Sequence, residues 1–213
     1  MNAACIDRPF LKSSCLTSLL LFALLPAYGA AAEPSLASVF GDHMVLQRER
    51  PVQIWGTADA GVELRVSLAG HAAEARSDES GAWSVILPAL SAGGPHRLQL
   101  SGPGGVVRTV DDILAGEVWL CSGQSNMEYP VRHLNEPWRD TQDPPPTIRL
   151  LTVGHDHSTR PLSAFRKAEG WTVAQPDAVA EFSAACYLFA RELQQTLDVP
   201  FGLIDASWGG SAI

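Results

Sequence analysis

Residues 36–113 alternate apolar and polar side chains with a period of two. In the clearest run, residues 62–68 (VELRVSL), four apolar residues alternate with three polar ones, as expected of a strand with one buried face. Similar runs lie at 52–55, 83–87, 97–100 and 106–110, and turns rich in Gly, Pro and Asp separate them. Short strands at such regular intervals predict an all-β sandwich domain over residues 33–115.

The pattern changes at Gly116. Residues 118–121 (VWLC) form a short, continuous apolar run that ends in the small polar residues 122–126, which is typical of a strand buried on both faces. Five apolar residues then recur in steps of four, three, four and four, which predicts one face of a helix: Phe182, Cys186, Phe189, Leu193 and Leu197.

Residues 199–206 indicate another buried strand. The order strand, helix, strand is that of a parallel α/β sheet, but residues 116–213 are fewer than the ~150 that such a domain commonly needs. We therefore expect residues 116–213 to be the N-terminal, truncated part of an α/β domain, with strand 199–206 left as an unpaired, exposed edge.

Residues 1–32 have the pattern of a signal peptide. Arg8 and Lys12 give a positive start, residues 16–25 form an apolar stretch too short to span a bilayer, and residues 30–32 are small enough for a cleavage site. We expect a secreted or periplasmic protein that has no membrane attachment once this segment is removed.

Charge and cysteine content narrow the picture further. The formal net charge is −8 and there is no basic run, which excludes a typical nucleic-acid partner. Cys121 and Cys186 remain after removal of the leader and could pair in an oxidising compartment, but both have apolar neighbours, so we favour two buried free thiols over a disulfide. No cysteines have the spacing of a zinc site.

Ser125 is the strongest candidate nucleophile. It follows the buried run, and Gly123 two residues earlier permits a tight turn that projects the serine into a cleft. Met127 stands where a G-x-S-x-G elbow needs its second glycine, so that version of the turn is not supported. A serine in this place can also be only a helix N-cap.

The sequence around Ser125 closely resembles the nucleophile segment of sialate O-acetylesterases, which belong to the SGNH hydrolase superfamily. Three segments carry the resemblance in the right order: FGDHMVLQ at 40–47, GEVWLCSGQSNME at 116–128, and GLI at 202–204 with SWGGSAI at 207–213. The fold class implied is a β-sandwich followed by an SGNH-type α/β domain with a parallel sheet.

The resemblance implies that Ser125 attacks an ester carbonyl and forms an acyl-enzyme. The Ser125 N–H and an N–H of the Gly209–Gly210 loop would stabilise the oxyanion; we favour Gly210, with Gly209 as the alternative. Gln124, Asn126 and Glu128 are close enough in sequence to contact substrate. Neither a metal nor a cofactor is implied.

The relatives also use an Asp-x-x-His pair near their C-terminus as base and orienter. That pair is not found in these 213 residues, so we expect it beyond residue 213 and expect the 213-residue chain to be inactive alone. We interpret His155–Asp156–His157 as a solvated loop, and His133 as part of a polar loop.

Three functions follow from these features. The leading one is a serine-dependent carbohydrate O-acetylesterase of the sialate type, with an O-acetylated carbohydrate as substrate. The alternatives are an acetylxylan or other plant-glycan deacetylase of the same superfamily, and a non-catalytic glycan-binding protein.

Overall fold

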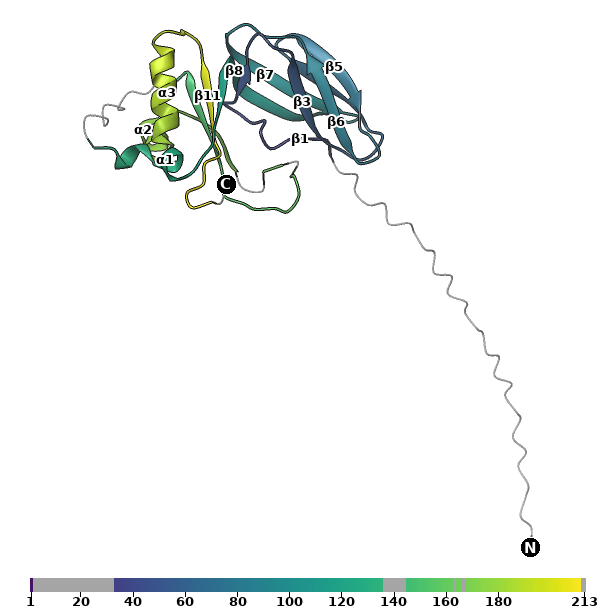
Figure 1. Ribbon diagram of the computed structural model, residues 1–213. Coiled ribbons are helices and arrows are strands. Elements are labelled where there is room, and N and C mark those ends of the chain that lie inside the picture. Colours follow the sequence, from purple (N-terminus) through teal and green to yellow (C-terminus); the bar gives the residue numbers. More distant parts are fainter. Residues whose placement is uncertain (2–32, 136–144, 163, 166–167, 212–213) are drawn as a thin grey trace. The chain divides into compact units, whose positions relative to one another are not determined.

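The computed structural model describes residues 1, 33–135, 145–162, 164–165 and 168–211 (Figure 1). The predicted signal peptide lies outside the described residues, apart from Met1. Residues 32–213 form one compact unit. In the ranges that the structure describes, no helix is long and apolar enough to cross a membrane.

A three-stranded sheet has the order β1 (Ser35–Leu36), β3 (Val52–Thr57) and β6 (Ala82–Leu87), and its pairs are antiparallel. The alternation read from the sequence decides which side faces inward. Ile54 and Val85 are buried, whereas Trp55 and Ile86 point outward. The predicted runs at 52–55 and 83–87 are therefore strands with one buried face.

An eight-stranded sheet contains the other antiparallel strands of residues 33–115. These are β4 (Glu63–Leu68), β5 (His71–Arg76), β7 (Gly93–Gly102) and the first part of β8 (Gly105–Cys121). The inward side chains of these strands pack in one core with Ile54 of β3, and fully buried examples are Val66, Leu98, Leu100 and Val110. The two sheets therefore share a hydrophobic core.

The strand β8 continues from the antiparallel part into the parallel part of the same sheet. β11 (Phe201–Asp205) runs parallel to the end of β8 on one side and to β9 (Ile148–Val153) on the other, and β10 (Ala168–Val173) is antiparallel to β9. The short β2 (Val45–Gln47) is parallel to β8 at residues 114–116. The proposed boundary at 115/116 falls inside β8, and the division into two domains stays a prediction.

The expectation that strand 199–206 has an unpaired edge is wrong. β11 has hydrogen-bonded neighbours on both sides, and Phe201, Gly202 and Leu203 are buried. Gly202 fits there because a Cβ at this position would come within 2.7 Å of the Cβ of Val45.

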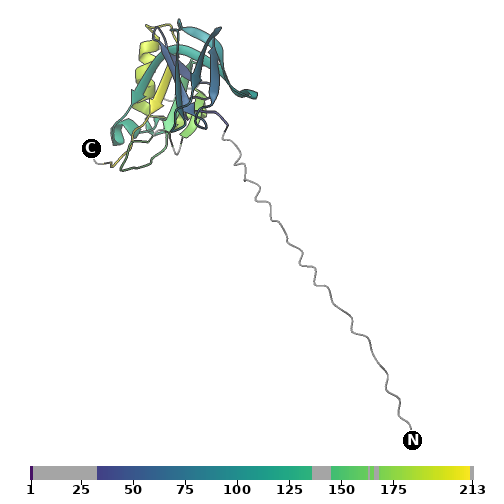
Figure 2. The same ribbon diagram turned by 90° about the vertical axis from the view of Figure 1, so that its right-hand side faces the viewer.

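The main helix, α3 (Ala184–Gln194), lies against β11 in both views (Figures 1 and 2). Ser183 is its N-cap and accepts a hydrogen bond from the Cys186 N–H at 3.2 Å. Three shorter helical segments are α1 (Ser125–Glu128), the 3₁₀ turn η1 (Val131–His133) and α2 (Pro176–Glu181). Tyr187 of α3 and Phe201 of β11 belong to a second core beneath these helices.

A partly buried ion-pair cluster connects the segment 40–47 to β9. Arg149 Nη1 donates to Asp112 Oδ2 at 2.6 Å, and His43 Nδ1 lies 2.7 Å from the same oxygen. Burial acts to raise the pKa of the Asp112 carboxyl, but the hydrogen bonds from Arg149 and His43 outweigh it and hold the pKa below its ordinary value. The FGDHM segment therefore has a structural role at this junction.

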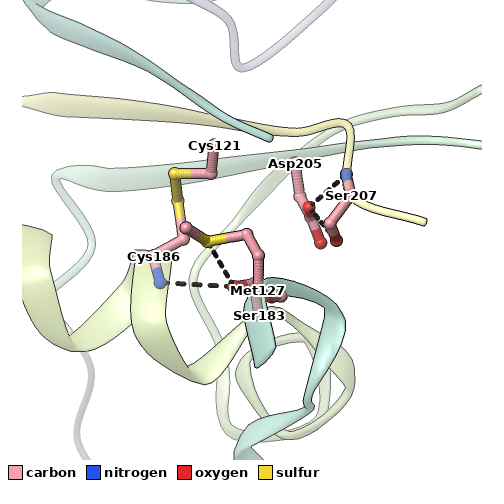
Figure 3. Close-up of a disulfide and its surroundings, with 6 residues drawn as sticks. All are labelled: Cys121, Met127, Ser183, Cys186, Asp205 and Ser207. Carbon is pink, nitrogen blue, oxygen red and sulfur yellow. Dashed lines mark hydrogen bonds between the residues drawn. A yellow bond between two sulfur atoms is a disulfide. The ribbon is translucent and has the colours of Figure 1, made fainter. Parts of the chain in front are cut away.

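Cys121 and Cys186 form a disulfide with Cα atoms 5.9 Å apart (Figure 3), so the preference for two free thiols is wrong. Their apolar surroundings are real, since both side chains are buried, but burial does not distinguish a thiol from a disulfide. The bond joins the end of β8 to α3.

Candidate active site

Ser125 lies where β8 ends and α1 begins, and its side chain is exposed. Gly123 makes the preceding turn with φ of +152°, a backbone conformation that L side chains rarely adopt. The segment is held from the β11 side, because Ala206 N–H donates to Cys121 O at 2.8 Å and Trp208 N–H to Gly123 O at 2.9 Å. The turn predicted to present the serine is therefore formed.

The same segment is anchored to α3. The Ser183 hydroxyl, which caps α3, also donates to the Met127 carbonyl of α1 (Figure 3). The disulfide also joins the end of β8 to α3 at Cys186, so a covalent and a hydrogen-bonded link hold the segment around Ser125 to this helix.

A second loop, residues 206–211, lies beside Ser125. Asp205 shapes its start by accepting hydrogen bonds at Oδ1 from the Ser207 N–H (2.9 Å) and hydroxyl (2.6 Å) (Figure 3). The loop brings Gly209 so close that a Cβ at this position would lie 3.2 Å from Ser125 Oγ. Two segments about 80 residues apart, predicted to meet at the carboxyl ends of parallel strands, do meet.

Glu128 connects the two loops. Its Oε2 accepts a hydrogen bond from the Gly209 N–H at 2.8 Å, and its Oε1 lies 3.1 Å from His155 Nε2. The Gly209 amide is therefore occupied by a carboxylate. Within the described ranges, the amides of Ser125 and Gly210 donate to no acceptor, which leaves both of them available to a ligand.

His155 lies in an exposed loop, as expected, but it also contacts this site. Its ring stacks on Trp208 with centroids 4.7 Å apart and an interplanar angle of 5°, and its Nε2 is 3.1 Å from Ser207 O. The sequence held a signal for this, because residues 148–153 end at the same sheet edge as residues 118–121. His157 is exposed, as expected of a loop.

The chain was compared in sequence with protein families and with known proteins. No protein-family model matches the chain. It is 31% identical to mouse sialate O-acetylesterase over 195 residues (83% of this chain, 36% of the mouse protein). It is 30% identical to the rat enzyme over 213 residues (92% and 39%), and 31% identical to the human enzyme over 198 residues (83% and 37%).

A solved structure agrees. A carbohydrate acetylesterase from Xanthomonas citri superposes with a TM-score of 0.79 at 36% identity, over 84% of this chain and 41% of that one. The chain belongs to the sialate O-acetylesterase family. It spans about two fifths of the length of these relatives.

The remaining site residues predicted for this family member have different surroundings. Gln124 is exposed, and its side-chain amide donates to the Ser211 carbonyl, so it also ties the nucleophile turn to the second loop. Asn126 is exposed. Their roles in substrate binding stay predictions, as do the roles of Ser125, Gly209 and Gly210.

Two further features limit the chemistry that these residues support. No three His, Cys, Asp or Glu side chains among the described residues are grouped so that they could hold a metal ion. No described side chain accepts a hydrogen bond from the Ser125 hydroxyl, and His155 faces Glu128 and Ser207 instead.

Proposed function

We propose that the complete protein is a serine-dependent carbohydrate O-acetylesterase of the sialate O-acetylesterase type. The observation that carries this proposal is the position of Ser125 beside the Gly209–Gly210 turn, on a segment held by β11, α3 and the disulfide. The family relationship supports acetylated carbohydrate as the substrate class.

The reaction begins when Ser125 Oγ attacks the acetyl carbonyl carbon while its proton passes to a base. The carbonyl oxygen becomes an oxyanion, and the free amides of Ser125 and Gly210 are the donors that this chain supplies; loss of one such donor costs about 100- to 1000-fold in rate. Collapse breaks the ester C–O bond, so the sugar oxygen leaves, takes up the proton from the base to become a hydroxyl, and leaves an acetyl-serine. Water then attacks the acetyl group and releases acetate.

Gly210 is the better candidate of the two loop glycines for the second donor. Its φ of +75° and its exposure leave its amide accessible, whereas the Gly209 amide already donates to Glu128. In this arrangement Gly209 provides the close approach to Ser125, and Glu128 holds the turn.

Replacement of the nucleophile tests the proposal. Ser125→Ala in the complete protein should lower the turnover of 4-nitrophenyl acetate to background, below about a thousandth of the wild-type rate, because nucleophile and base act as a unit. Ser122→Ala, at another exposed serine of the same turn, is the matched control and should retain activity. Retention of more than about a tenth of the rate in Ser125→Ala would exclude the assignment.

The two alternatives have their own readouts. A fluorophosphonate probe that labels Ser125 would exclude a non-catalytic glycan-binding protein. Release of acetate from acetylated xylan but not from O-acetylated sialic acid would favour the plant-glycan deacetylase.

A further inference from the structure

The segment that follows β9 connects the surroundings of Ser125 to the sandwich. At its start, His155 stacks on Trp208 and lies 3.1 Å from Glu128. Further along, the Phe165 N–H donates to Ser38 Oγ at 2.8 Å, directly after β1. Figure 1 shows this green segment passing below β1. One stretch of chain therefore borders both the candidate active site and the three-stranded sheet.

Two cavities lie along this stretch and share Trp55 as a wall. The first, of about 360 Å³, lies between Trp55 and Val153, Gly154 and Phe165. The second, of about 1070 Å³, covers the outer side of the β1–β3–β6 sheet, and Leu162 lines both cavities. We call the two together the Trp55 groove. It leads from the segment next to His155 to the outer face of the sandwich.

The groove wall has the chemistry that binds sugars. Trp55 is 39% exposed and is held by an edge-to-face contact with Phe40 at 4.6 Å, so its indole is a fixed apolar surface on which the C–H face of a sugar ring can stack. Around it lie hydroxyl and charged groups suited to sugar hydroxyls: Thr57, Arg76, Asp78, Ser80 and Ser84. A mainly apolar wall with a few polar groups is typical of a ligand site.

The charge of the groove lining bears on the kind of ligand that fits. Arg76 and Asp78 balance in charge, and the chain carries −8 overall, which favours a neutral ligand over an anionic one.

We propose that the Trp55 groove binds the neutral sugar chain that carries the acetyl ester. The substrate is then an acetylated oligo- or polysaccharide rather than a single sugar, and the groove supplies binding energy remote from the reacting ester. This inference rests on the proposed function for its link to catalysis, but glycan binding itself needs no functional nucleophile.

Binding and catalysis are therefore measured separately, with the complete protein. The probes are the unacetylated neutral chains xylohexaose, cellohexaose and mannohexaose, titrated calorimetrically against the Ser125→Ala protein, with xylose, glucose and mannose for comparison. We expect at least one hexasaccharide to bind at least about tenfold more tightly than its monosaccharide. Trp55→Ala should weaken that binding about tenfold or more, since it removes the stacking surface.

The controls separate stacking from folding. Ile86→Ala removes another outward side chain of the same sheet, 68% exposed and outside both cavities, and should leave hexasaccharide affinity unchanged. Trp55→Phe keeps an aromatic ring and should retain part of the affinity. In an otherwise wild-type protein, Ile86→Ala should hydrolyse 4-nitrophenyl acetate at the normal rate.

Two outcomes would overturn the inference: no hexasaccharide binds more tightly than its monosaccharide, or Trp55→Ala binds as well as Ile86→Ala does. The proposed function fails on a different result, which is the absence of Ser125-dependent ester hydrolysis in the wild-type protein. Oligosaccharide binding that depends on Trp55, without such hydrolysis, would leave the groove as a glycan-binding site alone.

Discussion

Loss of the Cys121–Cys186 disulfide should destabilise the protein more than any other single change near the site. The bond joins residues that are 65 positions apart in the sequence. Closing a loop of that size lowers the entropy of the unfolded chain, which stabilises the folded state by about 4 kcal/mol at 25 °C. For a chain of this length that is a fall in Tm of roughly 8–16 °C. In urea, with an m-value on the order of 2 kcal/mol/M, the midpoint should fall by about 2 M.

The measurement compares the oxidised wild type with Cys121→Ser/Cys186→Ala by urea denaturation followed by circular dichroism. Treatment of the wild type with a reducing agent should reproduce the loss without any mutation, which separates the cross-link from the change in side-chain volume. Because the bond links the segment that carries Ser125 to α3, the proposed esterase activity should be lost at lower urea than in the wild type. A difference in unfolding free energy below about 1 kcal/mol would refute the reasoning.

Two further predictions concern charged groups. Glu128→Ala should lower kcat for 4-nitrophenyl acetate about 10- to 100-fold, because it removes the charge-assisted hydrogen bond that holds the Gly209–Gly210 turn. Glu128→Gln keeps an acceptor and should lower kcat less. An unchanged kcat in Glu128→Ala would contradict this role. Asp112→Asn should reduce stability at pH 7 by about 2 kcal/mol, since it leaves Arg149 without its charged partner. Because the pKa of Asp112 is lowered in the folded state, its ionised form stabilises the fold at pH values above the ordinary carboxyl pKa of about 4. This stabilisation is lost as the pH falls through the lower pKa of the folded state. The urea midpoints of Asp112→Asn and the wild type should therefore converge at acidic pH.

The sequence predicted the elements whose pattern is local. The alternation at 62–68 corresponds to β4 (Glu63–Leu68), and the runs at 52–55 and 83–87 correspond to β3 and β6. Each strand buries every second side chain, so its own residues report its state. The meeting of Ser125 with the Gly209 loop was also accessible, because the ends of parallel strands gather at one sheet edge. The prediction that residues 118–121 are buried on both faces is wrong, because Trp119 and Leu120 are exposed.

What depends on spatial partners was not accessible in the same way. Nothing near Cys121 or Cys186 shows that the end of β8 faces the first turn of α3. The place of β11 between β8 and β9 likewise depends on strand order, which a run of apolar residues does not encode. His155 was missed because its partners, Glu128 and Ser207, lie 27 and 52 residues away in sequence.

The length of β8 restricts where the sequence of such a protein can accept insertions and deletions. One strand pairs with β7 in the sandwich and with β11 next to Ser125, and side chains along a strand alternate between its two faces. Inserting one residue between positions 113 and 121 would turn every later side chain to the opposite face, and would point Cys121 away from α3. Insertions and deletions that preserve the serine site should therefore be confined to the surface turns, and the spacing from Ile113 to Ser125 should stay fixed wherever the activity is kept.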